Sequence, residues 1–138
     1  MTPLRIYVDS SVFGGYFDDE FAESTRSFFD FVKAGRIIVL ISEVVARELA
    51  PAPEYVRSLV RTLSSKSVFD VEVTASALRL RDAYLRARIL GRASIIDATH
   101  VALATVARAD AIVSWNFKHI VRVDKMRAFN EVRFDDDS

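Results

Sequence analysis

The chain has 138 residues, a length at which one domain can bury enough apolar surface to fold without disulfides. Its 19 basic residues balance its 19 acidic residues, so a nucleic-acid partner would have to be held by a local basic surface. The absence of cysteine excludes disulfides, thiolate nucleophiles and Cys-ligated metal centres.

The sequence shows no targeting or membrane-spanning pattern. The N-terminus, MTPLRIYVD, lacks the layout of a signal peptide. The longest weakly charged stretch, residues 93–107, is interrupted by Asp97 and His100 and is shorter than the roughly 20 apolar residues of a membrane span. We therefore expect a soluble, intracellular protein with no membrane role.

Strands and helices are predicted to alternate through the first half of the chain. The β-branched and aromatic run before Asp9 favours a strand, and apolar residues at helical spacing favour a helix that Gly35 ends. Ser42 can cap the helix that follows the second strand. The predicted elements are strands at 5–8 and 36–41, and helices at 21–35, 42–50 and 54–64.

The second half continues the same alternation. Its predicted elements are a strand at 67–73, helices at 74–90, 94–108 and 124–132, and a short apolar run at 111–114. The helix at 94–108 is apolar nearly all round, which predicts deep burial. Residues 1–134 are expected to form a single domain, and residues 135–138 an acidic tail.

This order of elements predicts an α/β protein with a parallel sheet covered by helices on both faces. In such sheets, ligands bind beyond the carboxyl ends of the strands. Asp9 and Ser114 follow two of these ends, which makes that rim of the sheet the expected functional site.

Two acidic residues in the first half are candidates for this site. Asp9 directly follows a buried strand, although an aspartate there also commonly forms an Asx turn or caps a helix. Glu48 shares a helical stripe with Val44 and Val45, whereas a solvating glutamate would lie on the other face. Glu43 lies in the first helical turn, where the helix dipole favours a carboxylate without any chemistry. Glu48 is therefore preferred to Glu43.

Two further polar residues lie near the same rim. Asp97 follows Ser94 in the S-x-x-D form of a capping box, and an end of an otherwise apolar helix should also face the sheet edge where Asp9 emerges. Asn116 can hydrogen-bond at this rim or stabilise a turn. Oxygen ligands without a cysteine or histidine cluster suit Mg²⁺ or Mn²⁺, which could activate water for attack on a phosphodiester.

Four segments resemble, in order and spacing, the motifs of the PIN-domain nucleases. They are Tyr-Val-Asp9-Ser-Ser-Val, Ser42-Glu-Val-Val-Ala-Arg-Glu48-Leu, Asp97-Ala-Thr-His-Val-Ala-Leu-Ala and Ile-Val-Ser-Trp-Asn116-Phe. A stand-alone domain of this size is most similar to VapC-type toxins. The resemblance implies a three-layer α/β/α fold with a mainly parallel sheet of four to five strands. It also implies a cytoplasmic, Mg²⁺- or Mn²⁺-dependent endoribonuclease, often a homodimer, inhibited by a cognate antitoxin.

The resemblance assigns site roles by position. The residues that match the family's acidic metal-site positions are Asp9, Glu48 and Asp97. Asn116 falls where many members have a fourth acid, and it keeps an oxygen ligand while losing a charge. We therefore expect one well-held ion and a second that is weak or dependent on substrate. Ser114 matches a small hydroxyl residue near the site, and Ser10 could contact phosphate or a ligand water.

A basic stretch leads towards Asp97. Its arginines are opposed only by Asp82, and they are Arg79, Arg81, Arg86, Arg88 and Arg92. This surface could hold RNA phosphates, with Arg88 and Arg92 as substrate candidates, or it could be a solvated face or an antitoxin contact. His100, inside an apolar helix, is expected to be a hydrogen-bonded core residue, and His119 could touch substrate.

Several other functions are disfavoured. The dinucleotide-binding fingerprint, the P-loop and the G-x-S-x-G elbow are all missing, and Ser11 stands where an aspartyl phosphatase would have a second acid. Two alternatives to a toxin remain: a PIN-like nuclease of RNA processing, and a non-catalytic RNA- or protein-binding module in which Asn116 marks decay of the site. The short C-terminus also leaves little room for a last strand at 132–134.

Overall fold

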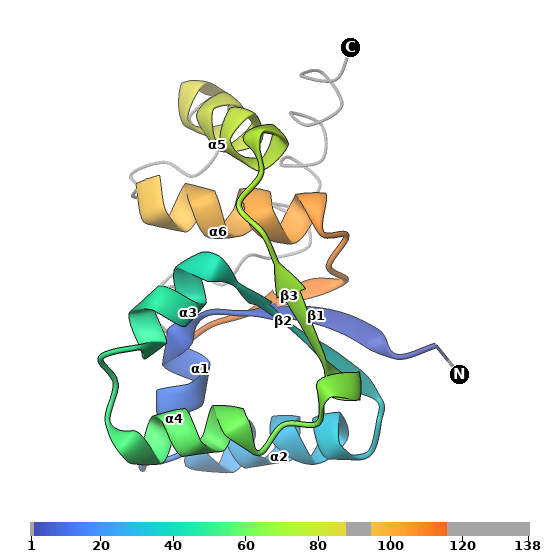
Figure 1. Ribbon diagram of the computed structural model, residues 1–138, viewed down its shortest axis with the longest axis vertical. Coiled ribbons are helices and arrows are strands. Elements are labelled where there is room, and N and C mark those ends of the chain that lie inside the picture. Colours follow the sequence, from blue (N-terminus) through green and yellow to red (C-terminus); the bar gives the residue numbers. More distant parts are fainter. Residues whose placement is uncertain (1, 88–94, 116–138) are drawn as a thin grey trace.

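Strands and helices alternate along the chain in the computed structural model, which describes residues 2–87 and 95–115 (Figure 1). The elements in chain order are β1 (Leu4–Val8), α1 (Ser10–Gly15), α2 (Ala22–Lys33), β2 (Ile37–Ser42), α3 (Glu43–Leu49), α4 (Glu54–Arg61), the 3₁₀ turn η1 (Ser65–Ser67), β3 (Val68–Val71), α5 (Ala75–Ala87), α6 (Ile95–Val106) and β4 (Ala111–Val113).

The described strands form one parallel sheet in the order β3-β2-β1-β4. Ile6 of β1 is paired with Val39 of β2 on one side and with Ala111 of β4 on the other. Because the strands run in the same direction, the residues after β1, β2 and β4 meet at one edge. The predicted parallel sheet is confirmed, and it brings the segments around Asp9 and Ser114 together.

Helices cover the sheet on both faces, which confirms the three-layer α/β/α architecture (Figure 1). Ile6 and Val8 of β1 point into a core shared with α1, α2, α3 and α4. Tyr7 and Leu40 point to the opposite face, where they pack with residues of α5 and α6. The short strands β1 and β2 are thus buried on both faces, as their unbroken apolar runs predict.

The ends of the helices follow local chemistry. Gly35 adopts a φ of +77° after α2, which explains why this helix stops there. The Ser42 hydroxyl accepts a hydrogen bond from the Val45 backbone N–H and so caps α3. The short helix α1 was not predicted, because its sequence, SSVFGG, contains poor helix formers. Its Asp9 cap and the burial of Val12 and Phe13 stabilise it instead.

The other predicted elements lie close to their observed bounds, with one difference in burial. The helix at 94–108 is described from Ile95 and is buried at Ala98 and through residues 100–104. Ile95 and Ile96, in its first turn, are exposed. The predicted helix at 124–132, the tail at 135–138 and the segment 132–134 lie outside the described residues. None of the helices in residues 2–87 and 95–115 has the length and apolar character needed to cross a membrane.

Candidate active site

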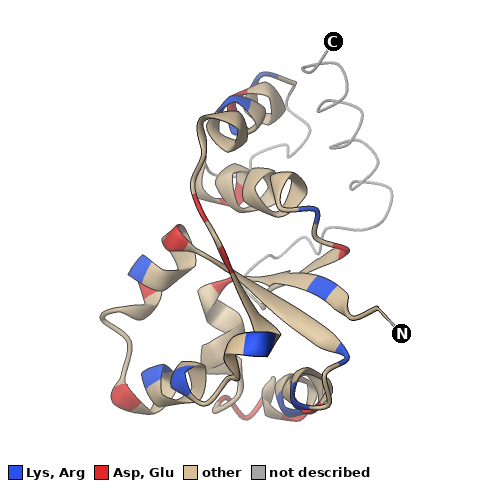
Figure 2. Ribbon diagram, turned by 45° about the vertical axis from the view of Figure 1, so that its right-hand side comes forward, with Lys and Arg blue, Asp and Glu red and all other residues tan. Residues whose placement is uncertain are grey.

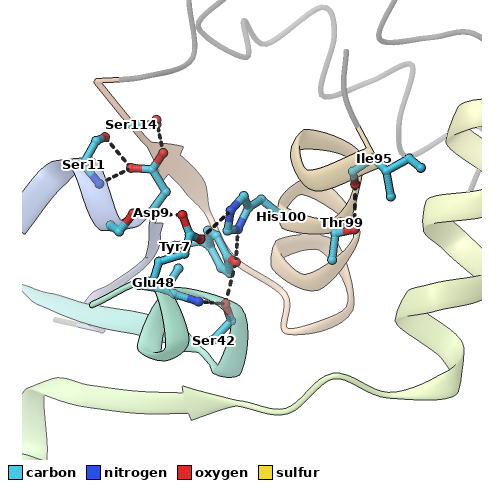
Figure 3. Close-up of polar contacts among 11 residues, drawn as sticks. Tyr7, Asp9, Ser11, Ser42, Glu48, Ile95, Thr99, His100 and Ser114 are labelled. Atoms are coloured by element: carbon cyan, nitrogen blue, oxygen red, sulfur yellow. Dashed lines mark hydrogen bonds and ion pairs between the residues drawn. The ribbon is translucent and has the colours of Figure 1, made fainter. Parts of the chain in front are cut away.

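Asp9 is a buried carboxylate at the carboxyl edge of the sheet, with only 6% of its surface exposed. Its Oδ1 accepts hydrogen bonds from the Ser11 backbone N–H (3.0 Å) and the Ser11 hydroxyl (2.5 Å). Its Oδ2 accepts one from the Ser114 hydroxyl at 2.5 Å (Figure 3). Asp9 therefore caps α1 and also lies at the rim of the sheet, so both sequence interpretations describe its position.

The segment after β4 is fixed onto α1 and α2 through Trp115. Its backbone N–H donates to the Ser11 hydroxyl (2.9 Å), and its indole N–H donates to Thr25 Oγ1 (3.0 Å). The indole also stacks on Phe21 at a centroid distance of 5.1 Å. A Cβ at Gly15 would lie 2.5 Å from the indole, so glycine makes this approach possible. These contacts hold Ser114 against Asp9.

Glu48 reaches the same rim from α3. Its Oε2 accepts a hydrogen bond from the Ser10 hydroxyl (3.1 Å), and its Oε1 lies 3.4 Å from His100 Nε2. The side chain is 41% exposed, so the carboxylate has these protein contacts and is also open to solvent. Glu43, on the same helix, instead lies 3.8 Å from exposed Arg47. The structure thus places Glu48, rather than Glu43, beside the residue that follows Asp9.

A buried row of hydrogen-bonding side chains lies behind Glu48. The Tyr7 hydroxyl lies 2.6 Å from His100 Nδ1 and 2.9 Å from Ser42 Oγ (Figure 3). Burial raises the pKa of Tyr7 well above its usual value; the Ser42 hydrogen bond opposes this, and the charges of Asp9 and Glu48 add to it. Tyr7 is therefore a neutral phenol at physiological pH.

His100 is a hydrogen-bonded core residue, as the sequence indicated, but it also belongs to the site. Sequence reasoning did not place Tyr7, Ser42 or His100 there. The spacing of these residues in the sequence could have indicated it: Asp9 follows Tyr7 by two in extended backbone, and His100 follows Asp97 by three on a helix. Both spacings put side chains on the same side of their element.

Asp97 lies in the first turn of α6 and is half-buried. Its proposed capping partner, Ser94, lies outside the described residues, as do Arg88, Arg92 and Asn116. Arg79 and Arg86 are exposed on α5. Basic and acidic residues are interspersed on α4 and α5 (Figure 2).

The donor types at this rim suit a hard cation, because carboxylate oxygens are the ligands that Mg²⁺ and Mn²⁺ prefer. Within residues 2–87 and 95–115, however, no three His, Asp or Glu side chains are close enough to form a metal site. Asp9 and Glu48 are held by the adjacent hydroxyls of Ser11 and Ser10, while Asp97 does not join them in a complete ligand set. The chemistry of the residues fits a divalent ion, and their described arrangement supplies only part of its coordination.

Comparison with known proteins supports the fold. No protein-family model and no curated protein sequence matches the chain. Among solved structures, the chain is similar to VapC20 of Mycobacterium tuberculosis, a toxin that cleaves the sarcin–ricin loop. The match has a TM-score of 0.61 and 17% sequence identity, and it covers 82% of this chain and 91% of VapC20.

The chain therefore has a PIN-like α/β fold, which it shares with VapC20. The resemblance stated from its four sequence motifs is confirmed at the level of the fold.

Proposed function

We propose that the chain is a Mg²⁺- or Mn²⁺-dependent endoribonuclease and the toxin of a type II toxin–antitoxin pair. The observation that carries this proposal is the buried Asp9 carboxylate, held by Ser11 and Ser114 at the carboxyl edge of a PIN-like sheet. Glu48 accepts a hydrogen bond from Ser10, the residue that follows Asp9. A carboxylate held this firmly beside a second one is suited to a cation.

In the proposed site, Asp9, Glu48 and Asp97 hold the ion, and Asn116 supplies a neutral oxygen to a weaker second position. A divalent ion at such a site lowers the pKa of water and stabilises the charge that develops on a phosphodiester. The hydroxyls of Ser11 and Ser114 fix the orientation of Asp9, so that its oxygens are held in place before the ion binds. Arginines of the basic stretch, Arg88 and Arg92 included, would hold RNA phosphates.

The test is cleavage of labelled RNA by the purified protein with Mg²⁺ or Mn²⁺. The substrates are a transfer-RNA pool and a synthetic sarcin–ricin stem-loop, which is the kind of RNA that VapC20 cleaves. We expect Asp9→Asn, Glu48→Gln and Asp97→Asn each to lower the rate by about 100-fold or more. Glu43→Gln, on the same helix as Glu48, should cleave as wild type does.

Wild-type protein that leaves all RNA intact with both ions would contradict a nuclease and favour a binding module. Variants as active as wild type would contradict this site.

The toxin assignment has its own test. Induced expression of the chain should arrest growth, whereas Asp9→Asn should not, and co-expression of a cognate antitoxin should restore growth. Light scattering of the purified chain should show the homodimer common among these toxins. RNA cleavage without growth arrest would favour a nuclease of RNA processing instead.

A further inference from the structure

A buried chain of hydroxyl and imidazole groups ends on Glu48, and the nuclease chemistry proposed above does not use it. His100 is 3% exposed, and Tyr7 and Ser42 are also buried. His100 Nδ1 faces the Tyr7 hydroxyl at 2.6 Å, and its Nε2 faces Glu48 Oε1 at 3.4 Å. The imidazole therefore bridges the core and a carboxylate of the candidate site.

The hydrogen positions along this chain follow from counting donors and acceptors. Ser42 Oγ accepts the N–H of Val45 at 3.2 Å, and since either hydroxyl hydrogen can lie between Ser42 and Tyr7, Ser42 can be the donor to the Tyr7 oxygen. Tyr7 can then donate its hydrogen to Nδ1, which leaves Nε2–H directed at Glu48. In the opposite arrangement, Nδ1–H donates to Tyr7 and a lone pair on a neutral Nε2 faces the carboxylate. The first arrangement directs a hydrogen at the Glu48 carboxylate, whereas the second faces it with a lone pair, so the carboxylate favours the first.

In the first arrangement both oxygens of Glu48 face a donor. Ser10 Oγ donates to Oε2 at 3.1 Å, and His100 Nε2 lies 3.4 Å from Oε1. A half-exposed glutamate on a surface helix would otherwise sample several rotamers. Contacts of this kind often lengthen in a free enzyme and shorten when ligand binds, so 3.4 Å is compatible with a donor role.

We propose that His100 is a positioning residue whose Nε2–H aims the Glu48 carboxylate at the rim beside Asp9, with Tyr7 and Ser42 fixing the imidazole tautomer. The proposal rests on the proposed nuclease function for its catalytic meaning, whereas the tautomer and the contact with Glu48 can be tested without RNA or metal. His100 is too deeply buried to touch substrate, so it acts through Glu48.

The first test is the tautomer of His100 in long-range ¹H–¹⁵N correlation spectra of the full chain. The protein has two histidines, so a His119→Gln variant assigns the signals. We expect Nε2 to be protonated and Nδ1 to be an acceptor. Glu48→Gln should shift the Nε2 signal, and Glu43→Gln should leave it unchanged. A protonated Nδ1, or the same Nε2 signal in both glutamine variants, would overturn the proposal.

The second test compares His100→Gln with His100→Asn. Glutamine can place an amide N–H near the position of Nε2, whereas asparagine reaches only as far as Nδ1. We expect His100→Asn to lose about 10- to 100-fold in kcat and in Mn²⁺ affinity measured by calorimetry, the range typical of residues that orient metal ligands. His100→Gln should recover most of that loss, although both variants should lower Tm similarly.

The outcomes separate this proposal from the proposed function. Equal losses in the two His100 variants, in step with their Tm, would mean that His100 only fills the core. If wild type neither binds Mn²⁺ nor cleaves RNA, the proposed function fails, and the catalytic role of His100 fails with it. If wild type is active but the tautomer is wrong, this proposal alone is overturned.

Discussion

Single residues at the rim of the sheet serve folding and the candidate chemistry together. Asp9 caps α1 through the Ser11 N–H and accepts a hydrogen bond from the hydroxyl of Ser114, 105 positions away and directly after β4. A buried carboxylate needs such donors, because an ionised group without them loses its hydration uncompensated. The same bonds that stabilise the fold therefore also orient the Asp9 carboxylate.

Tyr7 makes the stability of the folded protein depend on pH. Its pKa is raised in the folded protein, mainly by burial, whereas a tyrosine in an unfolded chain ionises near pH 10. Above about pH 10 the unfolded chain therefore releases a proton that the folded chain retains, and stability falls as pH rises. Urea unfolding at pH 8 and at pH 10.5 should show this loss in wild type.

The control for this prediction is a pair of phenylalanine variants. Tyr7→Phe should be less stable at pH 8 by about 1–3 kcal/mol, because it leaves hydrogen-bonding groups of Ser42 and His100 without their partner. It should also lose less stability between the two pH values than wild type does. Exposed Tyr55→Phe should keep the wild-type loss. An unchanged pH dependence in Tyr7→Phe would contradict the assignment.

At the scale of elements, the contact of α1 with the segment after β4 depends on a glycine. A Cβ at Gly15 would lie 2.5 Å from the Trp115 ring and 2.9 Å from Thr25 Oγ1. We expect Gly15→Ala to cost about 1–3 kcal/mol and to lower activity, since displacing Trp115 also displaces Ser114. The neighbouring Gly14 has open space around it, so Gly14→Ala should stabilise α1 by about 0.5–1 kcal/mol. Chemical denaturation measures both changes, and equal effects would contradict this account.

Helices α2 and α6 end in the same backbone conformation with different residues. Gly35 has a φ of +77° after α2, and its N–H donates to Val32 O. Arg108 has a φ of 58° after α6, and its N–H donates to Thr105 O. Only glycine adopts this region without steric cost.

The two sites therefore predict opposite substitution effects. Gly35→Ala should destabilise the protein by about 1 kcal/mol, although open space surrounds the position. Arg108→Gly should stabilise it by about 1 kcal/mol or somewhat less. Relief of the backbone strain stabilises the fold, and the entropy that glycine gains in the unfolded chain offsets part of this effect. Thermal unfolding would measure both changes. Loss of stability in Arg108→Gly would indicate that the arginine side chain contributes more than its backbone strain costs.

For the whole molecule, the sequence predicted the layers of the fold better than it predicted the contacts between side chains. The apolar runs of β1 and β2 and the helical spacing of the segments between strands were sufficient for the three-layer parallel fold. They could not predict α1, whose six residues form a helix only because Asp9 caps it and Phe13 is buried. They also could not place His100 at Glu48, because that contact joins α6 to α3 through packing around β1.

The candidate carboxylates were predicted singly from their elements, and their mutual distances depend on the packing of the whole domain. Asp9 accepts the Ser11 hydroxyl and Glu48 accepts the hydroxyl of the neighbouring Ser10, whereas Asp97 does not complete a three-carboxylate group within the described residues. Like charges repel as they approach, so convergence of the three requires a compensating cation. Metal binding should therefore be coupled to the stability of the folded domain.

This coupling gives a prediction for the whole molecule. An ion that binds the folded chain and not the unfolded chain stabilises the fold by about 2.7 kcal/mol at a concentration 100 times its Kd, or roughly 10 °C in Tm for a domain of this size. Titration with MnCl₂ at constant ionic strength should raise the wild-type Tm, and EDTA should reverse the increase. Asp9→Asn should lose most of the increase and Glu43→Gln should retain it, because only the first removes a proposed ligand. An equal increase in both variants would place the Mn²⁺ elsewhere on the surface, since neither the buried carboxylate nor its charge would then be needed for binding.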